Sequence, residues 1–255
     1  MTTKLTIGIA GCTGRMGVAL VAAAHSNAAV KLVAGSVRAH EHQHAAGLFV
    51  TTSPAELAQK AEGIIDFTTP EATIALAQEV AKTGGIIVIG TTGFSEEQQK
   101  TLEICAKTAR IVQSGNFSLG VNILENLVER AASKLSDIYD IEINEMHHRH
   151  KKDAPSGTAL MLGRAAAKGR GVSLEEKKAI DRDGVRKAGD IGFSVLRGGD
   201  VVGIHNVLFA GGGELITLSH QGFSREIYAN GAIIAALWAK DKPAGMYNMR
   251  DVVGE

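Results

Sequence analysis

The first half of the chain alternates short, consecutively apolar runs with longer segments whose apolar residues recur every three or four positions. Consecutive apolar positions are typical of strands buried on both faces, and the longer period is that of a helix. The predicted strands are residues 5–10, 31–37, 63–67, 86–90 and 110–114. Strands of this kind that are joined by helices lie parallel, because a crossover helix returns the chain in the same direction.

Three of the predicted helices start at residues that cap helix amino termini. Ser53-Pro54-Ala55-Glu56 and Ser95-Glu96-Glu97-Gln98 have the spacing of a capping box, and Thr69-Pro70-Glu71 starts a third helix. The alternation of strands and capped helices predicts an α/β fold with a doubly wound parallel sheet over about residues 1–118.

After residue 118 the pattern changes to alternating polar and apolar positions. Alternation is typical of strands with one face exposed to solvent. The predicted strands are residues 139–144, 191–197, 201–209 and 214–220, and glycine-rich turns separate the last three. We therefore expect an antiparallel meander in a second, α+β domain, with helices at 119–135 and 224–240. The open face or edge of its sheet is a natural oligomer interface.

The composition is that of a soluble globular protein. Of the 255 residues, 45% are hydrophobic and 21% charged, which is enough apolar surface for a core. The 27 basic residues balance 27 acidic ones, which argues against nucleic acid as a partner. The apolar runs are too short for a signal peptide or a membrane span, and Cys12 and Cys105 cannot form a disulfide framework. We therefore expect a cytoplasmic protein that does not bind membranes.

The loop after the first predicted strand carries the first chemical signal. Gly11-Cys12-Thr13-Gly14-Arg15-Met16-Gly17 joins that strand to the first predicted helix. Glycines at such a turn let the backbone approach a pyrophosphate, whose charge is stabilised by free N–H groups and by the helix dipole. The position of the loop in a βαβ unit favours dinucleotide binding by residues 11–16. The alternative is an ordinary glycine-rich turn.

The end of the second predicted strand discriminates between the two nicotinamide dinucleotides. An NAD site usually places Asp or Glu there, to bond the ribose hydroxyls. Here the strand leaves through Ser36-Val37-Arg38, and the first acid is Glu41. The Arg38 guanidinium can pair with a 2′-phosphate, which an acid would repel. We therefore expect NADPH to be preferred, with NADH still possible; the alternative is that Arg38 is an ordinary surface residue.

Two further loops follow the fourth and fifth predicted strands. Ligands of parallel sheets bind beyond the carboxyl ends of the strands. The loop residues are mostly small or hydroxyl-bearing, which would admit the nicotinamide ribose. They are Gly90, Thr91, Thr92, Ser114, Gly115, Asn116 and Phe117. Each loop alone can also be explained as a turn.

The strongest signal is a basic segment followed by a helix start. None of the residues from His147 to Lys152 is acidic, in a chain whose formal net charge is zero. Pro155-Ser156-Gly157-Thr158 follows, and the N–H groups and hydroxyls at a helix start form an anion site. The combination suits a small dianion such as a dicarboxylate, and a histidine can deliver a proton. The alternative is a solvated basic loop before an ordinary capped helix.

The histidines also raise the possibility of a metal site. The candidate ligand sets are His40, His42 and His44, which alternate along one segment, and Glu145, His148 and His150. A polar loop explains the first set more simply, and the cations that flank the second would repel a metal. We therefore expect no metal.

Residues 142–159 resemble, along their full length, the signature of the dihydrodipicolinate reductase family, whose members act in lysine and diaminopimelate biosynthesis. Similar motifs recur in the family's order through almost the whole chain. They are the loop at 11–17, Asp66-Phe67-Thr68, Gly90-Thr91-Thr92-Gly93-Phe94, Asn116-Phe117-Ser118, residues 199–203, Asn230-Gly231-Ala232 and residues 249–252. Chance does not explain that order.

The resemblance implies a Rossmann-like dinucleotide-binding domain of residues 1–118, completed by residues 228–255. It implies a substrate-binding and tetramerisation domain of residues 119–227, and hence a homotetramer. It also implies an NAD(P)H-dependent oxidoreductase. In this reaction a nicotinamide hydride reduces 4-hydroxy-tetrahydrodipicolinate to tetrahydrodipicolinate, with loss of water.

The resemblance also assigns roles in the basic segment. His147 is the general acid, Lys151 a proton donor and carboxylate contact, and His148 a substrate ligand. Gly157 and Thr158 hold the other carboxylate. These roles agree with the chemistry, because hydride addition builds negative charge towards the imine nitrogen, which cations stabilise and a proton neutralises.

Three positions depart from the family pattern. Val37 stands where many members have an acid before the arginine, which favours NADPH over use of both cofactors. Ile204 and Thr69 replace a glutamate and an arginine found in other members, and no physical reason accounts for either change. Two other functions stay open. One is a dinucleotide-binding sensor, against which the cluster from His147 to Lys151 argues, and the other is a metal-dependent hydrolase.

Overall fold

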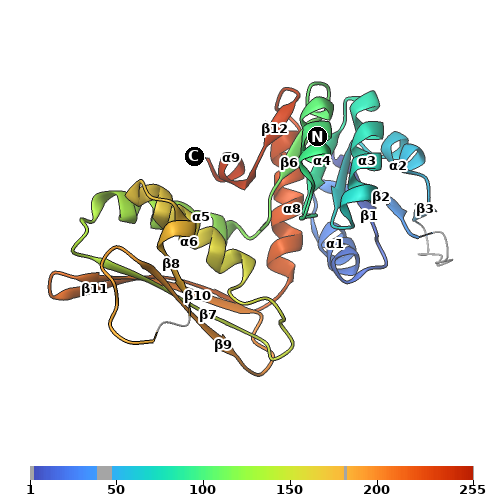
Figure 1. The fold of residues 1–255 in the computed structure, drawn as a ribbon. Coiled ribbons are helices and arrows are strands. Elements are labelled where there is room, and N and C mark those ends of the chain that lie inside the picture. Colours follow the sequence, from blue (N-terminus) through green and yellow to red (C-terminus); the bar gives the residue numbers. More distant parts are fainter. Residues whose placement is uncertain (1–2, 39–47, 181–182, 255) are drawn as a thin grey trace. The chain divides into compact units, whose positions relative to one another are not determined.

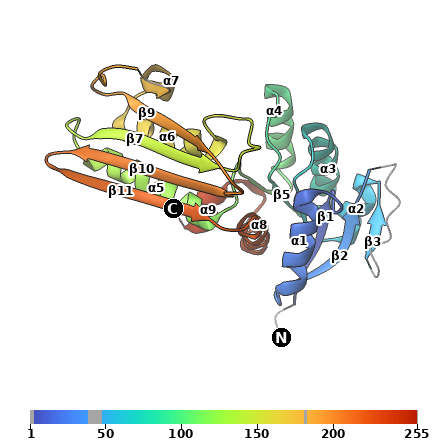
Figure 2. The same ribbon diagram turned by 90° about the horizontal axis from the view of Figure 1, so that it is seen from below.

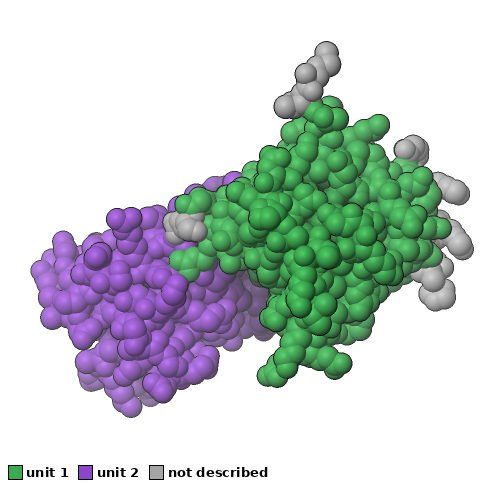
Figure 3. Space-filling model, turned by 90° about the horizontal axis from the view of Figure 1, so that it is seen from above, with its two compact units in different colours: residues 1–118, 226–255 green, residues 119–225 purple. Residues whose placement is uncertain are grey.

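The computed structural model describes residues 3–38, 48–180 and 183–254 of the chain. The chain divides into two compact units, which Figure 3 shows in different colours. The first unit contains residues 1–118 and 226–255, and the second contains residues 119–225. None of the helices within the described ranges is both long and apolar enough to cross a membrane.

The first unit is built on a parallel sheet with the strand order β12-β6-β5-β4-β1-β2-β3 (Figure 1). The strands are β1 (Leu5–Ala10), β2 (Val30–Ser36), β3 (Phe49–Thr51), β4 (Gly63–Asp66), β5 (Ile86–Ile89), β6 (Arg110–Gln113) and β12 (Gly245–Tyr247). Every neighbouring pair runs parallel, which confirms the doubly wound sheet. Strands β3 and β12 were not predicted, because each is a three-residue strand at an edge of the sheet.

Helices cover both faces of this sheet (Figure 2). On one face α1 (Arg15–Ser26) packs against α8 (Glu226–Ala239). On the other, α2 (Pro54–Lys60), α3 (Pro70–Thr83) and α4 (Glu96–Cys105) pack against one another in turn. The last helix of the unit is α9 (Met249–Val253). A sheet enclosed in this way is apolar on both faces, as the consecutive apolar runs predicted.

The predicted helix starts are confirmed with one correction. Ser95 and Gln98 form the complete capping box at the start of α4. Ser53 caps α2 by accepting the Glu56 backbone N–H. The Glu56 carboxylate, however, accepts a hydrogen bond from the Thr51 hydroxyl at the end of β3. The capping box expected at residues 53–56 is therefore only half formed.

Helix α8 brings the end of the chain into the core of the first unit. It is buried along most of its length and contacts β4, β5 and β6. Gly231 permits this approach, because a Cβ at that position would lie 1.7 Å from the backbone oxygen of Phe117. The segment after β6 and the middle of α8 are thus in direct backbone contact.

The second unit contains a five-stranded sheet with the order β11-β10-β7-β9-β8. Its strands are β7 (Asp140–His147), β8 (Lys178–Ile180), β9 (Ile191–Arg197), β10 (Gly203–Gly211) and β11 (Glu214–Gly222). Its helices are α5 (Leu119–Lys134), α6 (Gly157–Arg170) and α7 (Leu174–Lys177). Helices α5 and α6 lie on one face of the sheet, and the apolar positions of β7 and β10 pack beneath them (Figure 1).

The antiparallel meander expected for this unit is wrong. Strands β9 and β10 are consecutive in sequence but do not pair, because β7 lies between them. Strand β9 runs parallel to β7, since α6, α7 and β8 intervene and return the chain in the same direction. Among the described strands of the unit, only β10 and β11 form the expected hairpin, through the turn at 211–213.

A buried carboxylate joins two loops at the carboxyl edge of the first sheet. Asp66 ends β4 and has 0% of its surface exposed. It accepts hydrogen bonds from the backbone N–H of Thr68 at 3.0 Å and from the Thr68 hydroxyl at 2.6 Å. The Thr73 hydroxyl also donates to it. Burial raises the pKa of Asp66, and the bonds from Thr68 and Thr73 oppose that effect.

We expect Asp66→Asn to change how stability depends on pH. Because the folded pKa lies above the ordinary 3.8, the folded protein holds this proton more tightly than the unfolded chain. Stability is therefore lost as the pH rises through the folded pKa, at up to about 1.4 kcal/mol per pH unit. Urea unfolding from pH 4 upwards should show this loss in the unmodified protein and not in Asp66→Asn.

The exposed Asp241→Asn variant is the control for this measurement, because it removes a carboxylate of the same unit without removing a buried one. Identical pH slopes for Asp66→Asn and the unmodified protein would contradict the prediction.

Candidate active site

The glycine loop lies between β1 and α1 and has the conformation that the sequence predicted. Gly11 has a φ of 64°, in the left-handed region, and its carbonyl accepts the Gly14 N–H at 3.0 Å. A Cβ on Gly17 would lie 2.1 Å from the Gly11 oxygen, so only glycine lets α1 begin this close to the loop. Gly14 precedes α1 without a side-chain cap, and no acid occupies its first turn. This helix terminus suits an anion.

Cys12 faces the second strand of the sheet. It is buried, and a Cβ on Gly35 would lie 2.7 Å from its sulfur. The Cys12 N–H also donates to the Ser36 carbonyl at 3.0 Å. The glycine loop is therefore bonded to the end of β2. Arg38 lies two residues beyond that end and is exposed, while Glu41 and the three histidines at 40, 42 and 44 lie outside the described residues.

The loops after β5 and β6 contain both exposed and buried residues from the predicted set. Thr92 and Gly115 are exposed, whereas Thr91, Asn116 and Phe117 are buried. A Cβ on Gly90 would lie 2.1 Å from the Phe67 ring, which packs edge-on against Phe117 with its centroid at 5.5 Å. The Ser114 hydroxyl bonds within its own loop. These loops are thus shaped by packing around the Phe67 ring.

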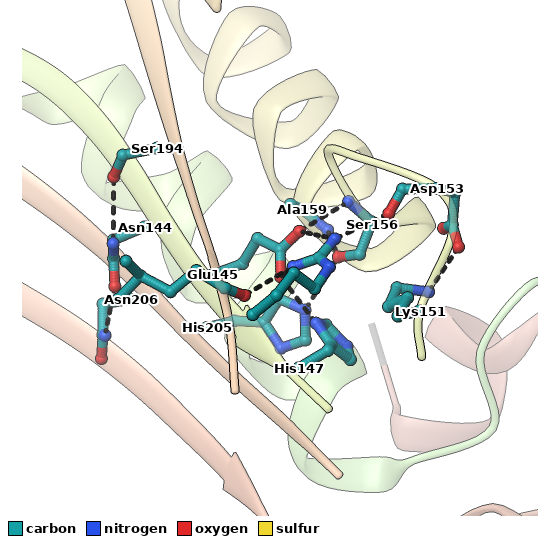
Figure 4. Close-up of polar contacts among 12 residues, drawn as sticks. Asn144, Glu145, His147, Lys151, Asp153, Ser156, Ala159, Ser194, His205 and Asn206 are labelled. Atoms are coloured by element: carbon teal, nitrogen blue, oxygen red, sulfur yellow. Dashed lines mark hydrogen bonds and ion pairs between the residues drawn. The ribbon is translucent and has the colours of Figure 1, made fainter. Parts of the chain in front are cut away.

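A buried carboxylate organises the basic segment in the second unit (Figure 4). Glu145 on β7 is 1% exposed. The Arg197 guanidinium donates to both of its oxygens, at 2.8 and 2.9 Å. The Ser156 backbone N–H donates to one oxygen at 3.0 Å, and Nδ1 of His147 lies 2.6 Å from the other. One side chain therefore connects two strands with the start of α6.

Two histidine rings pack against each other beside this carboxylate. The rings of His147 and His205 meet edge-on, with centroids 5.0 Å apart. Nε2 of His205 lies 3.1 Å from the Ser156 hydroxyl, which also caps α6 by accepting the Ala159 N–H at 3.1 Å. Nδ1 of His205 is buried and has no hydrogen-bond partner.

Burial and neighbouring charge shift the pKa values of these groups. Burial alone would raise the pKa of Glu145, but the hydrogen bonds from Arg197 and His147 outweigh it and hold that pKa below its ordinary value. Burial lowers the pKa of His147, and the hydrogen bond to Glu145 opposes this. Burial also lowers the pKa of His205, to about 3. Glu145 is therefore a carboxylate anion and His205 is neutral at physiological pH.

The remaining residues of the predicted cluster follow β7 along the chain. Lys151 is largely buried, and its Nζ lies 2.9 Å from the exposed Asp153 carboxylate. His148 is half-buried, with its ring centroid 6.3 Å from that of His150. Gly157 is exposed at the first position of α6, and Thr158 follows it. The first turn of α6 contains no acid.

This arrangement can bind an anion next to a proton donor. Lys151 and the amino terminus of α6 supply positive charge, and Arg197 compensates the negative charge of Glu145. His147 can exchange a proton through Nε2, because Nδ1 is bonded to Glu145. The geometry therefore suits protonation of a bound, negatively charged substrate.

Comparison with known proteins decides the family. The family model "Dihydrodipicolinate reductase, N-terminus" matches residues 5–117, and the corresponding C-terminus model matches residues 120–253. The chain belongs to the dihydrodipicolinate reductase family. The family is one of NAD(P)H-dependent oxidoreductases, so its members use a nicotinamide cofactor.

Individual relatives match over the full length. The 4-hydroxy-tetrahydrodipicolinate reductase of Caulobacter vibrioides is 49% identical over 259 residues, covering 100% of this chain and 99% of that protein. The protein of the same name from Dinoroseobacter shibae is also 49% identical, covering 96% of this chain and 97% of its own. Dihydrodipicolinate reductase from Paenisporosarcina sp. TG-14, solved with dipicolinate bound, has a TM-score of 0.84 at 24% identity and covers 98% of this chain and 99% of its own. Its likeness confirms the Rossmann-like fold with a second α+β domain.

The sequence did not predict several residues that organise the candidate site. The sequence assigns no role to Arg197 or His205, and it offers Glu145 only as a candidate metal ligand. The signal for Glu145 was present, because residues 145 and 147 alternate on one strand and so share a face. Arg197 pairs with His147 in the register of β7 and β9, which could be known only once β9 was placed beside β7.

The structure gives no support for a metal at Glu145, His148 and His150, whereas the set at residues 40, 42 and 44 lies outside the described residues. Both oxygens of Glu145 are engaged by protein donors. No group of three or more His, Cys, Asp or Glu residues poised to hold a metal occurs in the part of the chain that the structure describes.

We expect His205→Gln to reduce the acid sensitivity of the fold. The unfolded chain binds a proton at His205 below about pH 6.5, but the folded chain does so only near pH 3. The stability that depends on the neutral ring is present above pH 6.5 and is lost as the pH falls towards 3. Urea unfolding between pH 6.5 and 4 should show a slope up to about 1.4 kcal/mol per pH unit steeper in the unmodified protein.

The exposed His150→Gln variant is the control here, because it removes an imidazole from the same unit. If His205→Gln and His150→Gln lose stability equally on acidification, the prediction is wrong.

Proposed function

We propose that this protein reduces 4-hydroxy-tetrahydrodipicolinate to tetrahydrodipicolinate in lysine and diaminopimelate biosynthesis. The observation that carries the proposal is the cluster in which Glu145 holds His147 and the start of α6 together, in a chain of the dihydrodipicolinate reductase family. The full-length relatives bear the name of this activity, and a structural neighbour binds dipicolinate, a dicarboxylate.

The substrate is a dianion, and the second unit offers separate contacts for its two carboxylates. Lys151 and His148 lie on the loop after β7 and bind one carboxylate. The backbone N–H groups of Gly157 and Thr158, at the positive end of the α6 dipole, bind the other. Gly157 suits this role, because a Cβ there would meet no atom within 4 Å and the backbone is open to a ligand.

Proton delivery falls to His147, with Lys151 as a second donor. Burial lowers the pKa of His147, so the ring of the free protein is mostly neutral at pH 7. A bound dianion raises that pKa, because opposite charge favours the imidazolium. Substrate binding thereby prepares the acid that neutralises the developing negative charge on the substrate. The nicotinamide cofactor supplies the hydride when bound.

The first unit, residues 1–118 completed by residues 228–255, binds the dinucleotide in this proposal. The pyrophosphate lies at the glycine loop, residues 11–16, where α1 begins without a side-chain cap or an acid in its first turn. The loops at Gly90 to Thr92 and Ser114 to Phe117 border the nicotinamide ribose. Residues 119–227 bind the substrate.

The same second unit joins the protein into a homotetramer. The face of its sheet that α5 and α6 do not cover carries a ladder of polar side chains across adjacent strands (Figure 4). The Asn144 amide donates to Ser194 at 3.0 Å, and the Ser219 hydroxyl donates to Asn206 at 2.6 Å. Such a ladder satisfies its own polar groups and leaves a sheet face suited to packing against a second copy.

We expect Lys151→Ala and His147→Ala to lower kcat/KM by about 100-fold or more, because each removes a proton donor or a charge that acts on the reacting ring. The measurement is NADPH oxidation coupled to dihydrodipicolinate synthase, which supplies the unstable substrate. Lys152→Ala, which removes the adjacent exposed lysine, is the matched control and should stay near the activity of the unmodified protein. Full activity of both site variants would refute the assignment.

We expect the protein to prefer NADPH through Arg38, whose guanidinium pairs with the 2′-phosphate. Arg38→Ala should raise the KM for NADPH about 10-fold and leave the KM for NADH nearly unchanged, since NADH lacks that phosphate. Steady-state kinetics with both cofactors tests this, and Lys31→Ala on β2, the strand that precedes Arg38, controls for general loss of positive charge. Equal kcat/KM values for NADPH and NADH in the unmodified protein would contradict the predicted preference for NADPH.

A further inference from the structure

Both oxygens of the Glu145 carboxylate accept hydrogen bonds. The role of His147 as an acid does not by itself explain why Glu145 is buried beside it. We propose that Glu145 is a positioning residue that fixes the tautomer of His147 and locks this proton donor to the amino terminus of α6. The inference rests on the proposed function, because it concerns the acid of that reaction.

The tautomer follows from the contact between the two side chains. Nδ1 of His147 lies 2.6 Å from a carboxylate oxygen of Glu145, which is an ionised acceptor without a proton of its own. Nδ1 must therefore carry a hydrogen in both protonation states of the ring. Nε2 is then the nitrogen that gains and loses the proton.

The ring of His147 is buried, and a glycine leaves space beside its Nε2. The nearest position across the sheet is Gly203, where a Cβ would lie 3.0 Å from Nε2. Any other residue at 203 would crowd the nitrogen that exchanges the proton. Gly203 on β10 thus leaves Nε2 free to exchange a proton, and Glu145 on β7 keeps the hydrogen on Nδ1.

The second oxygen of Glu145 links the acid to the anion site. It accepts the Ser156 backbone N–H, immediately before the first residue of α6. Arg197 holds the carboxylate with two bonds and also donates to the Asp153 carbonyl at 2.6 Å, in the loop that leads from Lys151 to Ser156. The positions of His147 and of the amino terminus of α6 are therefore both fixed by hydrogen bonds to Glu145.

Charged and titratable groups reach His147 from each neighbouring element. They are Glu145 on β7, Arg197 on β9, His205 on β10, and Lys151 with its partner Asp153 on the loop after β7. Glu145 is the one among them that favours the imidazolium by direct contact. Removing the Glu145 charge lowers the pKa of His147. Because kcat depends on the protonated ring, the alkaline limb of the pH profile of kcat then shifts to lower pH.

The decisive variant is Glu145→Gln, because glutamine keeps the shape and its one oxygen can still accept from Ser156 and from one N–H of Arg197. Its uncharged NH2 group replaces the oxygen at Nδ1 of His147, where Arg197 also loses its second acceptor. We expect kcat to fall by about 10- to 100-fold, the range typical of lost orienting carboxylates, with KM within about 3-fold. Nitrogen NMR of protein labelled with ¹⁵N-histidine should show the Nδ1–H tautomer of His147 in the unmodified protein. Glu145→Gln should shift it towards Nε2–H.

Glu142→Gln is the matched control. Glu142 lies on the same strand and pairs with Arg186 at 3.0 Å, so this variant removes a Glu–Arg pair without touching His147. It should leave both kcat and the His147 spectrum unchanged. A merely structural role for Glu145 would give Glu145→Gln lower stability with an unchanged tautomer and pH profile.

The tautomer in the unmodified protein tests the inference even if Glu145→Gln does not fold. An Nε2–H tautomer there, or a kcat for folded Glu145→Gln within about 2-fold of the unmodified protein, would overturn it. A protein with no reductase activity but with the Nδ1–H tautomer would refute the proposed function, while the tautomer that Glu145 fixes would stand.

Discussion

Glu145 buries a negative charge in the second unit, and that charge determines how the surrounding chain is arranged. An uncompensated ion in a protein interior costs several kcal/mol, so the fold must bring donors to it. Arg197 supplies two, and His147 and the Ser156 N–H supply the others. These donors come from β9, β7 and the start of α6. The ion thereby requires these three elements to meet at one point.

The buried carboxylates of Asp66 and Glu145 are compensated in different ways. Asp66 in the first unit has hydroxyl and amide donors but no cation in hydrogen-bond contact, and burial raises its pKa. Glu145 has an arginine, and its pKa is lowered. A carboxyl without a cation serves to tie loops together, whereas an ionised one can also orient a charged imidazole.

The sequence predicted the first unit well because local signals determine it. Consecutive apolar runs such as Ile86–Ile89 and caps such as Ser95 depend only on neighbours in the chain. For the second unit, the sequence predicted most of the strands but not their order in the sheet. The pairing of β7 with β9 depends on contacts between residues that are distant in sequence. Edge strands of three residues, β3 and β12, are too short for a period to be recognised.

The same distinction holds for the site. His147, Lys151, Gly157 and Thr158 were found because they lie in one continuous motif. Arg197 and His205 were not, because each comes from a later strand and is at least 50 residues beyond His147 in the chain. A continuous motif identifies the residues proposed to contact the ligand. The residues that position them lie on neighbouring strands of the sheet, and these strands are distant in sequence.

The discontinuity of the first unit has a consequence for biosynthesis. Its sheet and outer helices are complete in sequence by residue 118 except for β12, yet α8, which covers one face, is translated only after the whole of residues 119–225. During synthesis, the apolar face that α8 covers stays uncovered while more than a hundred residues are added. The second unit, in contrast, is continuous in sequence and is synthesised without interruption. The nascent amino-terminal segment therefore exposes apolar surface that favours aggregation until α8 has been synthesised.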